Sequence, residues 1–135
     1  MRVVIDTNVM FSSFFGGNAL KIIDLWKSGH VTLCISAEII DEYYQTILLD
    51  PLTKENASLF FSVFAKQSNI LFTNTTRRIS VVTDPDDNKF IECAEALNAS
   101  HVISGDRALL AVKRYGNIKI VTPKNFLDER KNANS

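Results

Sequence analysis

The chain has 135 residues, 46% of them hydrophobic, and its fifteen basic and fifteen acidic side chains cancel. This length and composition indicate one globular domain with its own core, which excludes a disordered chain. Balanced charge excludes a broad basic surface, so any nucleic-acid binding must rely on local patches.

The first part of the chain predicts two strands, each followed by a helix. Residues 3–5 are short, wholly apolar and β-branched, as in a buried strand. Gly17-Asn18 then opens an amphipathic helix. Residues 31–35 predict the second strand, and Ser36 is a suitable N-cap for a helix that runs to about Leu49.

The remaining elements continue this alternation. A third helix follows Thr53, with an apolar face formed by Leu59, Phe60, Val63 and Phe64. The later elements are extended segments at 70–72 and 79–82, a helix over 84–97, a strand over 101–103, a short helix over 106–112, a strand over 118–121 and a helical turn around Phe126. Residues 128–135 form a polar tail that we expect to fray, so we assign a single domain to residues 1–127.

Strands separated by helices predict a parallel β-sheet covered on both faces, an α/β sandwich. In such sheets the functional crevice lies beyond the carboxyl ends of the strands. Cys34 and Cys93 sit among apolar neighbours and are predicted to be buried free thiols. No apolar stretch approaches the roughly 20 residues that cross a bilayer. The first residues reach Asp6 too early for a signal peptide, so the expected location is the cytoplasm, without a membrane partner.

Four acidic residues stand where hydrophobic runs stop: Asp6, Glu42, Asp87 and Asp106. Four such carboxylates, spread along most of the chain, predict one acidic pocket built by the fold. Like charges a few ångströms apart raise each other's pKa, and a divalent cation is the economical way to keep several of them ionised. Metal-assisted chemistry is therefore the leading hypothesis.

Asp87 is the most informative of the four acids. Phe90, Ile91 and Ala94 share its helix face, and this must be the buried face because the rest of the helix carries Lys89, Glu92 and Glu95. A carboxylate on the inward face needs a partner, since burying an unpaired charge costs several kcal/mol. A favourable position in the first turn of the helix explains an acid near this end, but not on the core face.

Local pattern leaves the other three acids open. Asp6 fits the cap of a following helix equally well, and Asp106 fits a simple strand-to-helix turn. Glu42 falls on the flank of an apolar stripe, and the helical wheel does not choose it over Glu38 or Asp41.

Four motifs taken together resemble a PIN domain. They are Val4-Ile5-Asp6-Thr7-Asn8-Val9, Ser36-Ala37-Glu38-Ile39-Ile40-Asp41-Glu42-Tyr43, Asp84-Pro85-Asp86-Asp87-Asn88-Lys89-Phe90 and Ile103-Ser104-Gly105-Asp106-Arg107-Ala108-Leu109-Leu110. The resemblance covers about residues 1–127, and the order and spacing of all four motifs make it specific. It is strongest to the toxin components of bacterial and archaeal toxin–antitoxin pairs, akin to VapC-like ribonucleases.

The resemblance implies a three-layer α/β/α sandwich with a central parallel sheet and a catalytic quartet that binds Mg²⁺ or Mn²⁺. The quartet comprises Asp6, Glu42, Asp87 and Asp106, which selects Glu42 over its neighbours. Asn8 and Ser104 carry over as supporting polar groups, and the family often has Thr where Ser104 stands. Single-stranded RNA is the implied substrate because family members cut it.

From these residues we predict a division of roles. Asp6, Asp87 and Asp106 hold the metal directly or through water, because Mg²⁺ takes one or two carboxylates and keeps several waters. Glu42 positions or deprotonates the attacking water. Lys89 and Arg107 flank two of the acids and are predicted to hold the phosphate backbone of the substrate.

Two partners are also expected. A toxin of this kind implies an antitoxin protein bound over the acidic mouth. Phe11, Phe14 and Phe15 crowd one short stretch and form a candidate contact face for a partner or a second copy, so we expect a homo-oligomer.

Two other classes of function compete with a ribonuclease. A phosphoryl-transfer domain of the receiver or haloacid-phosphatase type also has an early Asp, but it needs a second acid where this chain has Asn8. The second alternative is a catalytically inactive PIN-like domain that binds RNA or protein. The complete quartet of acids argues against that alternative.

Overall fold

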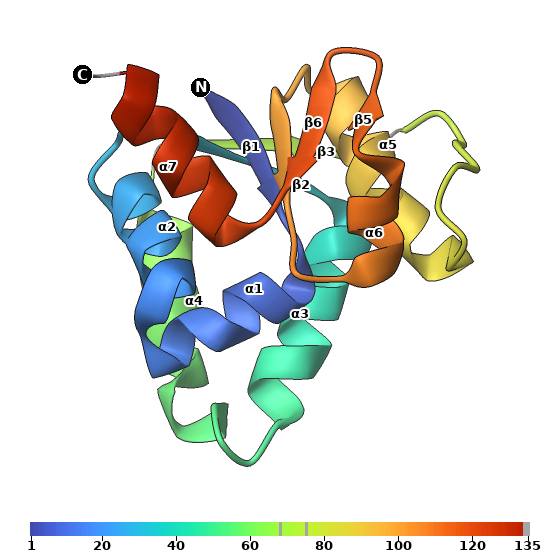
Figure 1. Ribbon diagram of the computed structural model, residues 1–135. Helices are drawn as coiled ribbons and strands as arrows, with labels where there is room; N and C mark the ends of the chain where they lie inside the picture. Colours follow the sequence, from blue (N-terminus) through green and yellow to red (C-terminus); the bar gives the residue numbers. More distant parts are fainter. Residues whose placement is uncertain (68, 75, 134–135) are drawn as a thin grey trace.

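Six strands form one sheet in the order β3-β2-β1-β4-β6-β5 (Figure 1). The computed structural model describes residues 1–67, 69–74 and 76–133. The strands are β1 (Arg2–Ile5), β2 (Thr32–Ser36), β3 (Ile70–Thr73), β4 (His101–Ile103), β5 (Arg114–Tyr115) and β6 (Ile118–Val121). The described pairs are parallel, apart from the short antiparallel hairpin of β5 and β6. The predicted parallel sheet is therefore confirmed, with one antiparallel edge.

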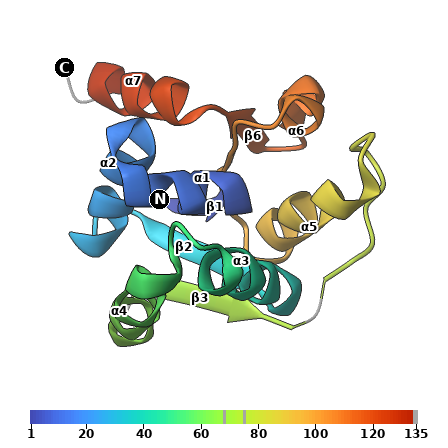
Figure 2. The same ribbon diagram turned by 90° about the horizontal axis from the view of Figure 1, so that it is seen from below.

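Helices cover both faces of this sheet. They are α1 (Thr7–Ser12), α2 (Gly17–Lys27), α3 (Ala37–Leu49), α4 (Lys54–Lys66), α5 (Asn88–Ala96), α6 (Arg107–Val112) and α7 (Pro123–Ala133), with 3-10 turns η1 (Ser13–Phe15) and η2 (Pro85–Asp87). Helix α5 packs against β1, β2 and β4, and it also contacts α3. Helices α2 and α7 pack against each other on the opposite side of the sheet (Figure 2). The molecule is the three-layer α/β/α sandwich that the sequence predicts.

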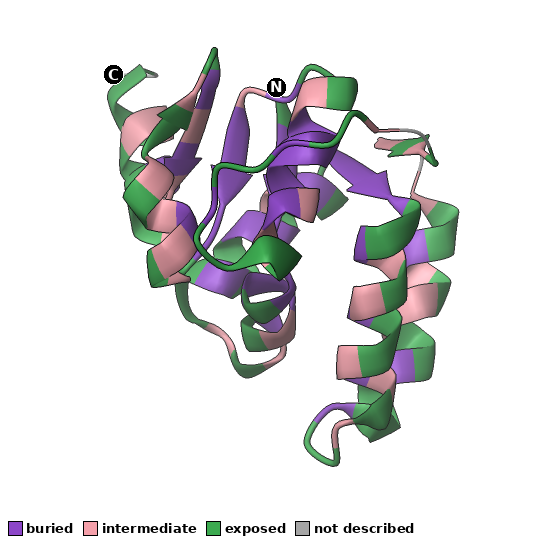
Figure 3. Cartoon of the chain, turned by 90° about the vertical axis from the view of Figure 1, so that its right-hand side faces the viewer, coloured by how far each residue is buried: buried purple, intermediate pink, exposed green. Residues whose placement is uncertain are grey.

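The core lies on both faces of the central strands, which are almost wholly buried (Figure 3). Helices α2, α3, α5 and α7 each insert one fully buried aromatic ring: Trp26, Tyr43, Phe90 and Phe126. Burying such a ring contributes roughly 1.5–3 kcal/mol, so each helix has its own apolar anchor on the sheet. Within the described ranges, every helix is too short or too polar to span a bilayer.

Local interactions fix the helices that lead to the acidic residues. The Ser36 hydroxyl accepts a hydrogen bond from the Ile39 N–H, which confirms Ser36 as the N-cap of α3. The Tyr43 hydroxyl donates a hydrogen bond to the Ile5 carbonyl, which ties α3 to the last residue of β1. Burial and nearby acidic groups raise the pKa of Tyr43, so this hydroxyl keeps its proton.

Residues 79–82, predicted as an extended segment, form no strand in the sheet. Ile79 and Val82 are nevertheless buried. Side chains of α5 hold this segment against the protein by accepting hydrogen bonds from its main chain. Glu92 accepts from the Ile79 N–H, and Asn88 accepts from the Val81 and Val82 N–H groups. The predicted outward position of Glu92 is therefore wrong, since it is 5% exposed and anchors this loop.

Two helices differ from their predicted form. Leu59, predicted on the inner face of α4, is 68% exposed, because α4 lies at the edge of the molecule and buries only Ala57 and Phe64.

The terminal turn around Phe126 extends as α7 to Ala133. Glu129 holds this extension by pairing with His101 and Lys119. Residues 128–133 of the predicted polar tail thus belong to α7, the expected fraying stays a prediction, and residues 134–135 lie outside the described residues.

Cys34 and Cys93 are buried, and no disulfide joins the described residues. Burial raises the pKa of the Cys34 thiol to about 11 and that of Cys93 to about 12. Both thiols therefore stay protonated at neutral pH, as expected for inert core residues.

Candidate active site

The acidic residues meet beyond the carboxyl ends of β1 and β4, two neighbouring strands at the centre of the sheet. The strand order reverses between β1 and β4, and ligands of open α/β sheets bind in the crevice at such a switch point. Asp6 directly follows β1, and its main-chain N–H donates to the Ile103 carbonyl at 3.0 Å. This bond joins the ends of the two strands that supply Asp6 and Asp106.

One small hollow of about 90 Å³ brings the four predicted acids together. Its lining consists of Asp6, Thr7, Asn8, Glu42, Thr46, Asp87, Phe90 and Asp106. The carboxyl groups come from the ends of β1 and β4, from α3 and from η2. We call this hollow the acidic pocket.

Asp6 is 3% exposed, and each of its carboxylate oxygens has a fixed partner. Oδ1 accepts from the Val9 N–H at 2.8 Å and thereby caps α1, while Oδ2 accepts from the Ser104 hydroxyl. Burial raises the pKa of Asp6, these two hydrogen bonds oppose the rise, and the charge of Asp106 adds to it. Asp6 is thus both a helix cap and a member of the acidic pocket.

Ser104 connects Asp6 to Asp106. Ser104 is fully buried, and its hydroxyl accepts from the Asp106 N–H at 2.9 Å while donating to Asp6. The Asp106 carboxylate accepts from the Ala108 N–H at 3.2 Å and caps α6. The position of Ser104 therefore sets the relative placement of two acids.

Asp87 is the last residue of η2, and Oδ2 is buried without a hydrogen-bond partner among the described residues. Phe90, Ile91 and Ala94 are buried on the same side of α5, as predicted. Burial raises the pKa of Asp87 to about 7, and the neighbouring Asp106 carboxyl acts in the same direction. An unpartnered carboxylate oxygen beside a second carboxyl group is suited to bind a cation.

Glu42 is contacted from two sides. The Thr7 hydroxyl of α1 donates to Oε1, and the Lys89 ammonium group of α5 pairs with Oε2. The side chain of Lys89 is 15% exposed and that of Glu42 is 34% exposed. Thr7 was not selected from the sequence, although its place between Asp6 and Asn8 was an available signal.

The other predicted residues lie at the rim. Asn8 is exposed, and with Asp106 it also borders an adjoining hollow of about 290 Å³. Arg107 is exposed at the start of α6. The predicted contacts of Lys89 and Arg107 with a phosphate backbone stay predictions.

The side chains of the pocket suit a hard divalent cation. Carboxylate oxygens are the ligands that Mg²⁺ prefers, and Asp87 supplies one without a partner. In the part of the chain that the structure describes, no three side chains of the usual ligand types are arranged to hold one ion. Mg²⁺ takes one or two carboxylates and completes its shell with water, and the unpartnered oxygen of Asp87 can supply one such ligand.

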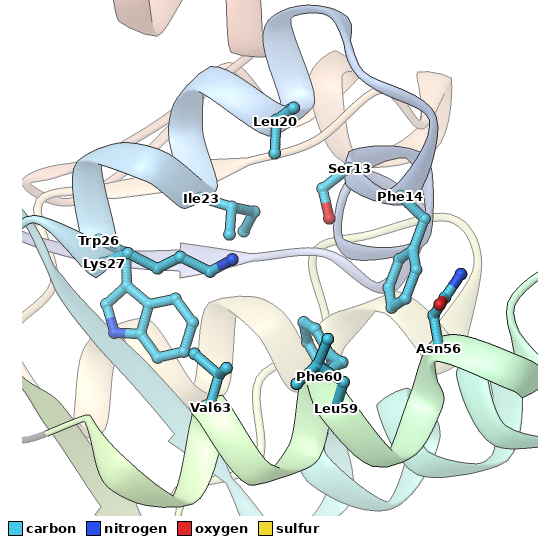
Figure 4. Close-up of a pocket in the computed structure, with 10 residues that line it drawn as sticks. All are labelled: Ser13, Phe14, Leu20, Ile23, Trp26, Lys27, Asn56, Leu59, Phe60 and Val63. Carbon is cyan, nitrogen blue, oxygen red and sulfur yellow. The ribbon is translucent and has the colours of Figure 1, made fainter.

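A separate hollow, of about 310 Å³, lies between α2 and α4 (Figure 4). Its lining consists of Ser13, Phe14, Leu20, Ile23, Trp26, Lys27, Asn56, Leu59, Phe60 and Val63. Of the predicted aromatic contact face, Phe14 packs on Phe60 with ring centroids 5.2 Å apart, and Phe15 is 57% exposed. This lining has no carboxyl group, so it does not share the chemistry of the acidic pocket.

Comparisons with known proteins agree with this geometry. A family model for the PIN domain matches residues 2–108, a span that contains all four acids. The uncharacterized protein MJ1680 of Methanocaldococcus jannaschii is 34% identical in an alignment that covers 96% of this chain and 91% of that protein.

A likeness to a solved structure concerns the fold alone. The crystal structure of VapBC2 from Rickettsia felis, bound to a DNA fragment from their promoter, has a chain that matches with a TM-score of 0.59. The two chains are 15% identical, over 89% of this chain and 97% of that one. The family match and the sequence relative carry the assignment, and they show that this chain belongs to the PIN domain family.

Proposed function

We propose that the protein is a Mg²⁺- or Mn²⁺-dependent endoribonuclease that hydrolyses phosphodiester bonds of single-stranded RNA. The observation that carries this proposal is the convergence of Asp6, Glu42, Asp87 and Asp106 on one small hollow. PIN domains are generally nucleases, and this chain has an acid at each of the four positions that the resemblance selects.

The proposed division of roles is the one that the family resemblance implies. Asp6, Asp87 and Asp106 would hold the cation directly or through water, and a bound cation would supply a Lewis acid for the phosphate oxygens. Glu42 orients the attacking water and accepts its proton. The water oxygen would bond to phosphorus as one phosphorus–oxygen ester bond breaks, and the leaving oxygen would take a proton from solvent.

Three further residues have proposed supporting roles. Ser104 holds Asp6 and Asp106 in fixed positions relative to each other through its two hydrogen bonds. Asn8 lines the pocket beside these acids, and Arg107 is exposed next to Asp106, where its charge can contact the RNA backbone. Lys89 pairs with Glu42.

We further propose that the protein is the toxin of a toxin–antitoxin pair and that its partners are RNA and an antitoxin protein. The likeness in fold to a chain of VapBC2 supports this partner class. An antitoxin that binds over the acidic pocket would block access to Asp6 and Asp106. A second copy of the chain is also a proposed partner, with Phe15 as an exposed apolar residue that a contact would cover.

The direct test is incubation of the purified protein with a mixed RNA pool, with Mn²⁺, with Mg²⁺ and with EDTA, followed by mapping of the new ends. We expect internal cuts in single-stranded segments that need the metal and stop with EDTA. Equal cutting in EDTA would remove the metal-dependent mechanism. Binding of RNA without any cutting would support the inactive RNA-binding alternative instead.

A further inference from the structure

The ammonium group of Lys89 is directed at Glu42. Its Nζ pairs with Glu42 Oε2 and lies 5.9 Å from the centroid of the Phe90 ring. Only 15% of the side chain is exposed. A lysine that contacts a nucleic-acid backbone presents its charge to solvent at the end of a flexible stem, whereas this stem is covered and its charge already has a partner.

Glu42 is fixed by this pairing together with a second hydrogen bond. Thr7 on α1 binds Oε1 and Lys89 on α5 binds Oε2, so both carboxylate oxygens have partners on different helices. Helix α3, which carries Glu42, packs against both α1 and α5. Hydrogen bonds that involve a charged group are roughly twice as strong as neutral ones, so this pair of contacts restricts the carboxylate to one orientation.

Lys89 also offsets the charge of Glu42, which lines the pocket. Asp87 and Lys89 are two residues apart, so the segment that supplies one of the acids also supplies a positive charge. That charge is paired with Glu42, while Oδ2 of Asp87 has no partner among the described residues. The cation-binding capacity of the pocket is therefore concentrated on Asp87 and its aspartate neighbours.

We propose that Lys89 is a positioning residue that fixes the carboxylate of Glu42 and prevents it from ligating the metal directly. This inference rests on the proposed nuclease function, because Glu42 acts there on the attacking water. It assigns Lys89 to the interior of the site and leaves backbone contact to exposed cations such as Arg107.

Kinetics of four variants separate this role from RNA binding. For Lys89→Met we expect kcat to fall by at least roughly tenfold with KM for RNA unchanged, since a misplaced proton acceptor slows the chemical step. Lys89→Arg keeps the charge and should recover most of kcat. Arg107→Met should instead raise KM and weaken the dependence of binding on salt. Lys21→Met, an exposed charge on α2, is the control that should change neither constant.

Two measurements test the same inference without RNA. In ¹H–¹⁵N spectra of lysine ammonium groups, the Lys89 signal should be protected from exchange, and Glu42→Gln should abolish that protection. In calorimetric titrations, Mn²⁺ should bind Lys89→Met more tightly than the parent protein, because a positive charge has left the pocket. Thermal melting of each variant shows that it is folded.

Several outcomes would overturn the inference. They are a rise in KM at unchanged kcat in Lys89→Met, no recovery in Lys89→Arg, weaker Mn²⁺ binding, and an unprotected ammonium signal. If the parent protein cuts no RNA, the nuclease proposal fails. The ammonium signal and the metal titration still decide whether Lys89 holds Glu42.

Discussion

The hydroxyl of Ser104 donates a hydrogen bond to the carboxylate of Asp6, which lies 98 positions away in the sequence. The same hydroxyl accepts from the main chain of Asp106. One buried oxygen atom therefore fixes the distance between the acid that follows β1 and the acid that follows β4.

Ser104→Ala should destabilise the protein and slow the proposed reaction. The change leaves the Asp106 N–H and one oxygen of Asp6 without their partner, which costs about 1–3 kcal/mol for buried groups. Denaturant unfolding measures this loss, and RNA cleavage measures the effect on kcat. Ser104→Thr keeps the hydroxyl and is the matched comparison. Equal stability and activity for Ser104→Ala and the parent protein would contradict the supporting role.

Asp6→Asn should abolish metal-dependent cleavage and leave melting unchanged or slightly raised. The amide oxygen can still accept from the Val9 N–H, and a carboxylate whose pKa is raised by burial is replaced by a neutral group. Asp24→Asn, on the exposed face of α2, is the control for the loss of one charge. Cleavage that persists in Asp6→Asn would remove Asp6 from the mechanism.

Stability of the metal-free protein should fall as the pH rises from about 4 to about 7. The folded protein holds the Asp87 proton up to a pKa of about 7, whereas the ordinary value is 3.8, so the folded state binds more protons in this window. Bound protons stabilise the state that holds them, and that stabilisation is lost as Asp87 ionises.

Melting curves in EDTA across this pH range test whether the protein loses stability as the pH rises. Saturating Mg²⁺ should reduce this loss of stability, because the cation favours the ionised form of Asp87. Asp87→Asn should remove much of the decline by itself. A metal-free melting temperature that rises steadily from pH 4 to pH 7 would show that the raised pKa of Asp87 does not govern stability.

Glu92→Ala should loosen residues 79–82 without removing a member of the acidic pocket. Its carboxylate accepts from the Ile79 N–H at 3.0 Å, and an unpaired buried amide costs about 1–3 kcal/mol. Hydrogen exchange should accelerate most at Ile79, with smaller effects on the sheet. Glu38→Ala, which removes an exposed acid from α3, is the control for the loss of one acidic side chain. Unchanged exchange at Ile79 would show that packing alone holds this loop.

Much of the fold follows from short-range chemistry that the sequence displays. The apolar run at residues 3–5 and the cap at Ser36 correspond to β1 and to the start of α3, because buried strands and helix ends have local signatures. The apolar pattern at 79–82 predicts an extended segment for the same reason, but this segment joins no strand of the sheet. Its main chain instead binds Glu92 and Asn88, and apolar pattern alone does not reveal such side-chain partners.

The acidic pocket was predictable in part. Asp87 could be selected because a carboxylate on an apolar helix face has few structural explanations. The helical wheel could not select Glu42, because its two partners, Thr7 and Lys89, belong to other helices. Contacts between distant helices carry no periodicity, so only the family resemblance identified Glu42 in advance.

The pairing of β1 with β4 has a consequence for biosynthesis. A ribosome delivers β1 first, but its neighbour β4 and the acid that follows it come from the last third of the chain. Partial products that still lack Asp106 therefore contain an incomplete set of carboxyl groups. On the proposed function, we expect such partial products to be inactive until Asp106 has been added and β4 has paired with β1.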